Sequence, residues 1–349
     1  MTDFQENIIF NTFNIRQALE KINTLSVNLT LFVVDADLRM VGTLTDGDIR
    51  RGLIKEIQLS DCVENVMRKN FQFFREDNYS VNDVKLVKEK HIRLVPVLNK
   101  KNEIIKVYDF NRIKSILPID VILMAGGRGE RLRPITDTVP KPLLKVGGKS
   151  IIDYNIDNFI LYGIENLYIT VHYLSEKIIK HVQNYSKEIN INCVNENFPL
   201  GTFGSVKKIE TIESDFVLIM NADLFTNIDY EDFFLTFIKS NADMAIATVP
   251  YTVNVPYAIM DTDGDVVKGL KEKPVLTHYA NAGIYIIRRE LIHIIPDAFF
   301  NATDFIQLLI ESGKKIIKYP IVGYWVDIGN QEDYKMVQEL VKHIKNQKE

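Results

Sequence analysis

The sequence predicts two domains, a smaller α+β domain over residues 1–117 and an α/β domain with a mostly parallel sheet over residues 118–349. Three observations support this division. A chain of 349 residues is long for one domain and comfortable for two. The first part contains a weak internal repeat, and from Val121 onward short apolar runs alternate with helical patterns. Such alternation favours a parallel sheet covered by helices on both faces.

The repeat in the first domain has the order strand, turn, strand, helix. LTLFVVDADLRMVGTLTDGDIRRGLI predicts two strands around a turn at residues 35–38, then a helix that begins near Asp46 or Asp48. HIRLVPVLNKKNEIIKVYDFNRIKSIL predicts the same succession, with its turn at residues 99–102 and a final helix that ends before Pro118. Between them, SVNDVKLVKEKH predicts an amphipathic helix capped by Ser80 or Asn82. Repeats of this size usually pack as a pair.

The second domain begins with the apolar strand VILMA, directly before a glycine-rich loop. IENLYITV, INCVN, FVLIMNA and DMAIATV predict further strands, and IIDYNIDNFILYG predicts a helix ended by Gly163. Ligands bind at the carboxyl ends of strands in such sheets. The glycine-rich loop therefore lies where we expect a ligand site.

Composition narrows the classes of function. The formal net charge of −4 and the pI near 6.0 argue against a general nucleic-acid-binding surface. Two distant cysteines, Cys62 and Cys193, form no metal-binding spacing and favour a reduced, cytoplasmic protein. We see no signal peptide and no run of about 20 apolar residues, so we expect no membrane span.

The loop sequence LMAGGRGERLRPITDTVPKPLL begins at Leu123 and concentrates glycine and positive charge. It lacks the third glycine of a dinucleotide fingerprint, and GGKS at residues 147–150 lacks the first glycine of a Walker A loop. Bare backbone N–H groups beside the fixed cations Arg131 and Lys141 suit a polyphosphate. The alternative is a plain glycine-rich turn with solvated arginines.

Several motifs now resemble one family. GGRGERLRPITDTVPKPLLKVGGKSII is similar to the signature GGxGxRLxPxTxxxPKPxxxxxGKPxI of the sugar-1-phosphate nucleotidyltransferases, with Ser150 in place of a proline. PLGTFGS resembles the family's PLGTAGA, and NADLF resembles its NGD strand end. KEKP, NAGIYII and WVDIGNQEDY follow in the family's order, so the resemblance spans about residues 120 to 335. It implies a Rossmann-like mixed, mostly parallel sheet of the nucleotide-diphospho-sugar transferase type.

The resemblance also implies a reaction and roles for residues. A sugar-1-phosphate oxygen attacks the α-phosphorus of a nucleoside triphosphate and pyrophosphate leaves, a step that needs charge neutralisation and in-line positioning. The implied catalytic residues are Arg131, Lys141 and Lys273. The implied nucleotide-binding residues are Met124, Ala125, Gly126, Gly127, Gly129 and Gly201. The implied sugar-binding residues are Glu272, Asn281 and Gly283.

Asp223 and Asp327 are candidate metal ligands because each follows a short apolar strand, in LIMNAD and GYWVD. Two carboxylates, together with phosphate oxygens and waters, describe a Mg²⁺ site. The metal would stabilise the charge that develops at phosphorus. The alternative makes both residues helix N-caps, since each precedes a turn.

The first domain resembles a second family. GTLTDGDIRR is similar to the GxxTxxDI signature of cystathionine-β-synthase (CBS) modules, in which Thr45 and Asp48 would contact an adenine-type nucleotide. The second repeat has Asp109 and Arg112 at the equivalent places, so we expect one nucleotide site at most. The alternative is a structural pair that sets the geometry of a homo-oligomer. Coupling of a bound regulatory nucleotide to catalysis would require different affinities for two states.

Together these resemblances favour a CBS-linked guanylyltransferase similar to the enzymes that supply GDP-glucosamine for bacterial legionaminic-type acids. The expected substrates are GTP and glucosamine-1-phosphate. Mannose-, heptose- or glucose-1-phosphate, and dTTP in place of GTP, are alternatives. A catalytically inactive CBS nucleotide sensor is an alternative of a different class.

Overall fold

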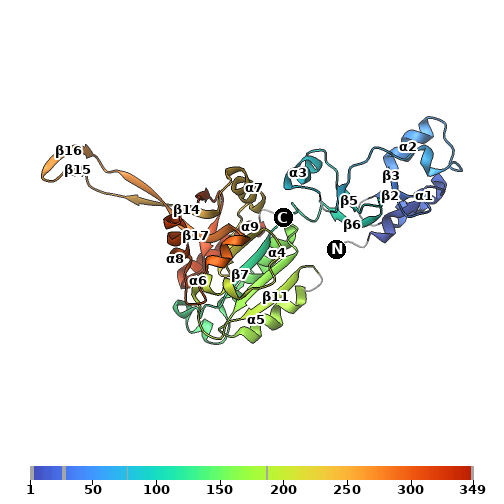
Figure 1. Cartoon of the computed structure of the whole chain (residues 1–349). Helices are drawn as coiled ribbons and strands as arrows, with labels where there is room; N and C mark the ends of the chain where they lie inside the picture. The colour runs from blue at the N-terminus through green and yellow to red at the C-terminus, as the bar shows by residue number, and fades with distance from the viewer. Residues whose placement is uncertain (1–3, 26–28, 77, 186–187, 347–349) are drawn as a thin grey trace. The chain divides into compact units, whose positions relative to one another are not determined.

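A computed structural model describes residues 4–25, 29–76, 78–185 and 188–346. The chain divides into two compact units, Met1–Ile116 and Leu117–Glu349 (Figure 1). Each unit has its own hydrophobic core, and each is described by itself. None of the helices in the described ranges combines the length and the apolar character needed to cross a membrane.

The first unit contains two three-stranded sheets with the same topology. In each sheet the first two strands are parallel and the last two form an antiparallel hairpin. The first repeat consists of β1 (Ile8–Phe10), α1 (Ile15–Thr24), β2 (Thr30–Val34), β3 (Met40–Thr45) and α2 (Asp46–Ile54). The second consists of β4 (Phe74–Arg75), α3 (Val81–Glu89), β5 (Leu94–Leu98) and β6 (Ile104–Asp109).

The two hairpins also share their turn geometry. Leu38 and Asn102, three residues after the start of each predicted turn, both have left-handed backbone conformations, with φ of 62° and 65°. The helices begin where side chains satisfy free backbone N–H groups. Helix α2 begins at Asp46, one of the two predicted starts, with Thr45 as its cap, and Ser80 caps α3 as predicted.

The predicted helix after Asp109 is wrong. The Oδ1 atom of Asp109 accepts a hydrogen bond from the backbone N of Asn111 at 2.9 Å, and its carbonyl accepts one from Arg112 at 3.0 Å. Asp and Asn favour such local turns over helix propagation. Ile113 and Ile116 still pack onto the core of the second repeat. The apolar spacing therefore predicted correctly that these residues are buried, but the helix that it also predicted does not form.

The second unit is built on a seven-stranded sheet with the order β11-β10-β7-β12-β17-β14-β18. All its neighbours are parallel except the two pairs that involve β17, which confirms the mostly parallel mixed sheet. The strands are β7 (Asp120–Ala125), β10 (Asn166–Val171), β11 (Asn190–Asn195), β12 (Phe216–Asn221), β14 (Met244–Asn254), β17 (Val275–Arg288) and β18 (Ile316–Pro320).

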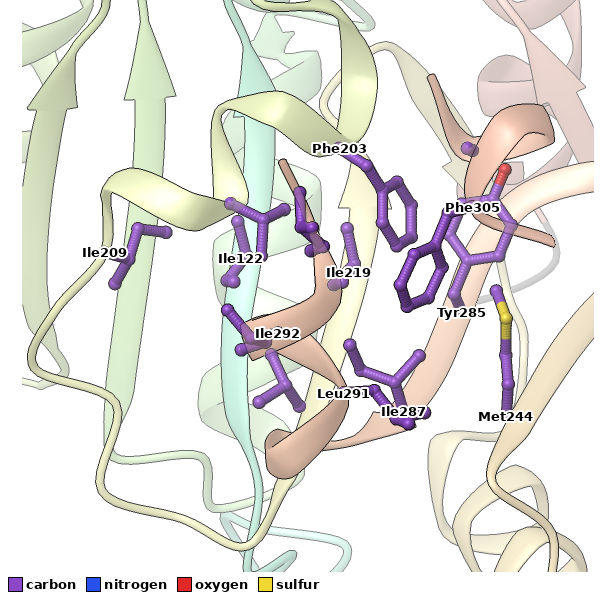
Figure 2. Packing of buried hydrophobic residues seen from close by; sticks show 14 of the residues in the cluster. Ile122, Phe203, Ile209, Ile219, Met244, Tyr285, Ile287, Leu291, Ile292 and Phe305 are labelled. Atoms are coloured by element: carbon purple, nitrogen blue, oxygen red, sulfur yellow. The ribbon is translucent and has the colours of Figure 1, made fainter. Parts of the chain in front are cut away.

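The central strands are apolar on both faces because helices cover both. Ile122 and Leu123 of β7 point to opposite faces, and both are fully buried. On one face Ile122 and Ile219 pack toward Leu291 and Ile292 (Figure 2). There the Phe203 and Phe305 rings stack with their centroids 4.8 Å apart. This core holds the carboxyl ends of β7 and β12 in place.

Six α-helices and three small sheets complete the described part of the second unit. The helices are α4 (Ile151–Leu161), α5 (Ser175–Val182), α6 (Gly201–Gly204), α7 (Tyr230–Ser240), α8 (Ala302–Glu311) and α9 (Gln331–Asn346). As predicted, Gly163 terminates α4: it lies two residues after Leu161 and has a left-handed φ of 67°. The small sheets pair β8 (Lys145–Val146) with β9 (Lys149–Ser150), β13 (Leu224–Thr226) with β19 (Trp325–Asp327), and β15 (Ile259–Asp263) with β16 (Val266–Lys271).

A long ribbon projects from the sheet of the second unit. The outer halves of β14 and β17 continue into the hairpin of β15 and β16, and the ribbon leaves the body of the unit (Figure 1). We call residues 250–280 the β-arm. All of its residues are exposed except the partly buried residues 255, 269 and 274.

Candidate active site

The glycine loop and the NADLF motif lie at one edge of the central sheet. β7 and β12 are parallel neighbours, with Met124 opposite Asn221 in the register. The loop that follows β7 and the Ala222–Asp223 pair that follows β12 therefore leave the sheet side by side. This is the edge at which ligands bind in parallel α/β sheets.

A cavity of about 350 Å³ opens at this edge. Five of the six predicted nucleotide-binding residues line it, together with Lys141 and Asp223. Its lining also includes Thr170, Glu196, Asn221 and Phe299. The predicted residues on the cavity are Met124, Ala125, Gly126, Gly127, Gly201, Lys141 and Asp223.

The loop requires glycine at positions 127 and 129 for two different physical reasons. No atom lies within 4 Å of a Cβ built on Gly127, which leaves its backbone open to a ligand. Gly129 is not a lining residue of the cavity, but it has φ of 64°, and a Cβ there would lie 3.3 Å from that of Lys141. The hydroxyl of Thr136 donates to the Gly129 carbonyl at 2.8 Å. Gly129 thus lets the loop turn tightly against the segment that carries Lys141.

Lys141 joins the two candidate metal ligands. Its ammonium group forms an ion pair with Asp223, and it lies 3.5 Å from Oδ1 of Asp327. The two aspartates converge because β13 and β19 pair with Leu224 opposite Asp327. The Lys141 side chain is only 11% exposed, so these charges interact with little screening by water.

Each of the two carboxylates has an oxygen that could bind a cation. The Oδ1 atoms of Asp223 and Asp327 are buried and accept no hydrogen bond from the described residues. Burial and the neighbouring charge of Asp223 raise the pKa of Asp327. Within the part of the chain that the structure describes, no third acidic, His or Cys side chain joins the pair. The donor set fits Mg²⁺, which usually takes one or two carboxylates and completes its shell with substrate oxygens and water.

Arg131 approaches the same carboxylates from the glycine loop. A Cβ built on Gly329, two residues after Asp327, would lie 3.3 Å from Nη2 of Arg131. The positive charge of Arg131 also opposes the rise in the pKa of Asp327. Arg131 is exposed and is not a lining residue of the cavity, so its side chain lies at the rim of the site.

Glu196 is a cavity residue that we did not predict. Its side chain is 7% exposed, its Oε2 accepts from the backbone N of Leu200 at 3.3 Å, and its Oε1 lies 3.0 Å from a Cβ built on Gly126. Burial raises the pKa of this carboxyl group, and the hydrogen bond from Leu200 opposes the rise. The signal in the sequence was an acidic residue just before PLGT, in NENFPLGT.

The predicted sugar-binding residues separate into two groups. Gly283 has φ of 71°, and a Cβ there would lie 2.6 Å from Nδ2 of Asn221, so this glycine packs against the cavity wall. Asn281 accepts from the backbone N of Gly283 at 2.9 Å and lines a second, more open hollow of about 550 Å³. Glu272 and Lys273 lie on the β-arm, where both are exposed, and the structure does not bring them to the first cavity.

In the first unit, Thr45 and Asp48 bond to each other, and Asp48 also bonds to two arginines. The Thr45 hydroxyl donates to Oδ2 of Asp48 at 2.5 Å, and Oδ1 of Asp48 accepts from Arg51 at 2.6 Å and from Arg68 at 2.7 Å. Asp48 is buried, and its interactions start helix α2 and anchor the chain around Arg68. Their role toward a nucleotide stays a prediction.

Comparison with known proteins adds independent observations. The nucleotidyl transferase family model matches residues 120–343, which is most of the second unit. The mannose-1-phosphate guanyltransferase of Pichia angusta is 28% identical over 226 residues, which cover 61% of each chain. The bifunctional protein GlmU of Methanocaldococcus jannaschii is 29% identical over 223 residues, which cover 62% of this chain and 52% of that protein. The matches thus span about half to three fifths of these relatives.

A solved structure also resembles this chain. HddC from Yersinia pseudotuberculosis, complexed with GMP-PN, matches with a TM-score of 0.50 and 26% identity. The match covers 64% of this chain and 99% of that chain. The matched share is thus close to the size of the second unit.

Proposed function

Because the chain belongs to the nucleotidyl transferase family, we propose that it joins a nucleoside triphosphate to a sugar-1-phosphate and releases pyrophosphate. One observation carries this proposal: the glycine loop, Lys141 and Asp223 line one cavity, and Asp327 lies beside the same lysine. Backbone donors, a buried cation and paired carboxylates are what a reaction between two phosphates requires.

The reaction forms one phosphorus–oxygen bond and breaks another. An oxygen of the sugar phosphate attacks the α-phosphorus, and the bond between the α-phosphorus and the bridging oxygen to the β-phosphate breaks. The nucleophile is already ionised at neutral pH, so the site needs no general base. Lys141 stabilises the negative charge on the α-phosphate, and Arg131 at the rim neutralises the outer phosphates.

Asp223 and Asp327 would hold Mg²⁺. When bound, the ion supplies positive charge to the reacting phosphates. The pairing of Lys141 with both carboxylates keeps them together before substrate arrives. With Mg²⁺ on the two carboxylates, the ammonium group of Lys141 would be available to the phosphate oxygens.

Glu196 favours GTP among the nucleotides. The Watson–Crick edge of guanine presents two adjacent donors, N1–H and N2–H₂, which a single carboxylate accepts. Uracil and thymine present one donor between two acceptors, and adenine presents an acceptor at N1. A buried carboxylate on the cavity wall beside Gly126 therefore matches guanine best. Two of the compared proteins agree with this choice, one named a guanyltransferase and one complexed with GMP-PN.

We infer glucosamine-1-phosphate as the sugar substrate, in the synthesis of bacterial surface sugars of the legionaminic type. This inference rests on the resemblance of the first domain to CBS modules linked to such guanylyltransferases. The test is pyrophosphate release with Mg²⁺ over a grid of GTP, dTTP, UTP and ATP with glucosamine-, mannose-, heptose- and glucose-1-phosphate. We expect the highest kcat/KM for GTP with glucosamine-1-phosphate.

A variant of a proposed metal ligand and a matched surface variant show whether the activity depends on the proposed site. Asp327→Asn removes a proposed metal ligand and is expected to lower kcat at least a hundredfold. Asp297→Asn removes a carboxylate that pairs with Lys208 on the surface, and it should leave kcat unchanged. A folded protein that binds nucleotide but releases no pyrophosphate from any pair would overturn the proposal in favour of a sensor. Release with mannose-1-phosphate alone would overturn only the choice of sugar.

A further inference from the structure

Thr170 is a buried polar residue of the cavity that the proposed reaction does not use. It lies in β10, opposite Val194 of β11 in the parallel register. The backbone N of Glu196 donates to the carbonyl of Val171 at 2.8 Å, so the pairing of the two strands continues to Glu196. Residues opposite each other, and residues two apart in one strand, share a face of the sheet, so Thr170 and Glu196 lie on the same face. Both residues line the cavity.

The hydroxyl group of Thr170 is deeply buried and unpaired. Thr170 is 1% exposed, and its Oγ1 has no hydrogen-bond partner among the residues that the structure describes. Buried polar side chains are nearly always hydrogen-bonded, and native proteins contain few exceptions. Within the described ranges the other hydroxyl of this kind belongs to Ser115 in the first unit, which lines neither of the two cavities described above. At Thr170 an unpaired hydroxyl coincides with a proposed binding site.

The carboxyl group of Glu196 is the charged group on which this hydroxyl acts. Burial raises the pKa of Glu196, and the N–H of Leu200 and the hydroxyl of Thr170 oppose the rise. The charge of a protonated His172 ring, whose Nδ1 lies 2.9 Å from the carbonyl oxygen of Glu196, acts in the same direction. Thr170 therefore supplies the side-chain hydroxyl that favours the ionised carboxylate.

Two further charged side chains line the cavity. They are Lys141 and Asp223, and they form an ion pair with each other. Each is thus already paired in the free protein. The protonation of Glu196 consequently depends mainly on its own burial and on the groups of β10 and Leu200 that surround it.

The carboxylate of Glu196 has one acceptor site more than the backbone and the base would use. An ionised carboxylate accepts about four hydrogen bonds, two at each oxygen. The N–H of Leu200 occupies one site on Oε2 at 3.3 Å. The N1–H and N2–H₂ groups of guanine would take two more. One site then remains, and the hydroxyl of Thr170 is an unpaired donor on the same face of the sheet.

We propose that Thr170 is a positioning residue for base recognition, because its hydroxyl donates to the Glu196 carboxylate in the nucleotide complex and thereby makes the site select guanine. This inference rests on the proposed function and deepens it. The contact closes when the nucleotide binds, since hydrogen bonds at such sites are often long or poorly aligned without substrate. Without the hydroxyl, Glu196 takes up a proton at higher pH. The acid form has a donor and an acceptor, which suits uracil or thymine better than guanine.

Nucleotide binding by calorimetry tests this role without turnover. GTP and UTP are titrated into the full chain over a range of pH, with Mg²⁺ and without sugar phosphate. Thr170→Val removes the hydroxyl and keeps the branched shape that suits a strand. At pH 7 we expect GTP affinity to fall about tenfold, while UTP affinity is kept or rises. GTP affinity declines as the pH falls through the pKa of Glu196, and this decline should begin about one pH unit higher in the variant.

Three further variants separate positioning from folding. Thr170→Ser keeps the hydroxyl and should retain the preference and the pH profile of the wild type. Thr170→Ala lacks the hydroxyl and should repeat the change seen in Thr170→Val, so it replaces that variant if valine prevents folding. Ser115→Ala removes a buried unpaired hydroxyl outside the cavity and should bind both nucleotides as the wild type does.

The Glu196→Gln background shows whether Thr170 acts through the carboxylate. There Thr170→Val should change neither the ratio of GTP to UTP affinity nor its pH dependence. Equal losses of GTP and UTP affinity in Thr170→Val, with an unchanged pH profile, would indicate a merely structural role and overturn the proposal. Wild-type GTP binding in that variant, or an equal loss in Thr170→Ser, would also overturn it.

Failure of this proposal is distinguishable from failure of the proposed function. If the wild type binds GTP no better than UTP, the choice of guanine fails together with the role of Thr170. If the wild type prefers GTP and Thr170→Val keeps that preference, only the role of Thr170 fails. Pyrophosphate release in the substrate grid tests the reaction class separately from both.

Discussion

The ammonium group of Lys141 forms an ion pair with the carboxylate of Asp223, which lies 82 residues later in the chain. This contact joins the glycine-loop segment to the end of β12 at the floor of the cavity. Asp327 lies close enough to share the same cation, at 3.5 Å. One positive charge therefore holds together two carboxylates that would otherwise repel each other.

Removal of Lys141 should make the second unit dependent on a divalent cation. In Lys141→Ala the two carboxylates keep their positions but lose the charge between them. Without Mg²⁺ we expect a loss of about 1–3 kcal/mol in the free energy of unfolding, because the pair is mostly buried. Addition of Mg²⁺ should restore most of the lost free energy of unfolding, because the ion is expected to bind where the ammonium group lay.

Thermal unfolding with and without Mg²⁺ measures this effect. Lys208→Ala is the matched control, because Lys208 pairs with Asp297 on the surface, where side chains are 41% and 68% exposed. That pair should contribute less than about 1 kcal/mol, with no response to Mg²⁺. An equal rise in Tm for wild type and both variants would contradict the role of the two carboxylates.

The sheet and the position of the cavity were predictable because they rest on local patterns. VILMA and FVLIMNA are short apolar runs whose ends carry glycines or an aspartate, and strands buried on both faces require such runs. Ser80 and Gly163 mark helix ends through their own backbone bonding. The parallel pairing of β7 with β12 then brings the two strand ends together.

Other features depend on tertiary contacts that no local pattern reports. Glu196 becomes a site residue only because β11 ends beside β10 and places it against Gly126. The segment after Asp109 has helical apolar spacing, but a side-chain turn stops the helix. The β-arm exposes apolar side chains, and nothing in its local sequence distinguishes them from strand residues that face a core. Lys273 consequently lies outside the cavity despite its motif.

Gly283→Ala should destabilise the second unit and disturb the cavity wall. The residue has φ of 71°, and its new methyl group would lie 2.6 Å from Nδ2 of Asn221. Left-handed strain contributes about 1–2 kcal/mol, and the steric conflict adds about 1–3 kcal/mol. We expect a lower urea midpoint together with weaker nucleotide binding, because Asn221 lines the cavity.

The Gly313→Ala variant separates the cost of backbone strain from the cost of the steric conflict. Gly313 has a similar φ of 67°, but no atom lies within 4 Å of a Cβ built there. It should lose only the strain contribution, about 1–2 kcal/mol, and keep the nucleotide affinity of the wild type. If urea unfolding shows the same loss in the free energy of unfolding for both variants, the steric conflict with Asn221 does not contribute to the effect at Gly283.

Glu196→Gln should change both nucleotide preference and pH dependence. An amide offers one acceptor and one donor, which suits uracil or thymine better than guanine. We expect GTP affinity to fall about 10- to 100-fold, with a smaller loss or a gain for UTP. Burial raises the pKa of Glu196. In the wild type, GTP affinity should therefore be highest above that raised pKa and decrease as the pH falls through it.

Calorimetric titration from pH 7 downward follows this change, and the Gln variant should show a flatter profile. Glu176→Gln, an exposed carboxylate at the start of α5, is the control and should bind GTP as the wild type does. A variant that keeps full GTP affinity would remove the structural basis for guanine in the proposed function. The reaction class would be unaffected.

Asp48→Asn should destabilise the first repeat much more than Asp83→Asn destabilises the second. Both residues occupy the third position of a helix that begins with a capping box, at Thr45 and Ser80. Asp83 is exposed, so its loss should affect stability by about 0.5–1 kcal/mol. Asp48 is buried and also accepts from Arg51 and Arg68, so its loss should remove about 2–3 kcal/mol.

The pH dependence provides a further check on Asp48. Burial alone would raise its pKa, but the hydrogen bonds from Thr45, Arg68 and Arg51 outweigh burial and lower the pKa below the usual value. A lowered pKa in the folded state stabilises the fold above the unfolded pKa of about 4, and this contribution is lost as the pH falls through the folded value. The protection factors of the β2–β3 hairpin amides, which are corrected for the intrinsic exchange rate at each pH, should thus fall in acid for the wild type. In Asp48→Asn they should already be low at pH 7 and change little in that window. Equal protection of the hairpin in the Asp48→Asn and Asp83→Asn variants would show that the two arginine contacts add nothing to the cap.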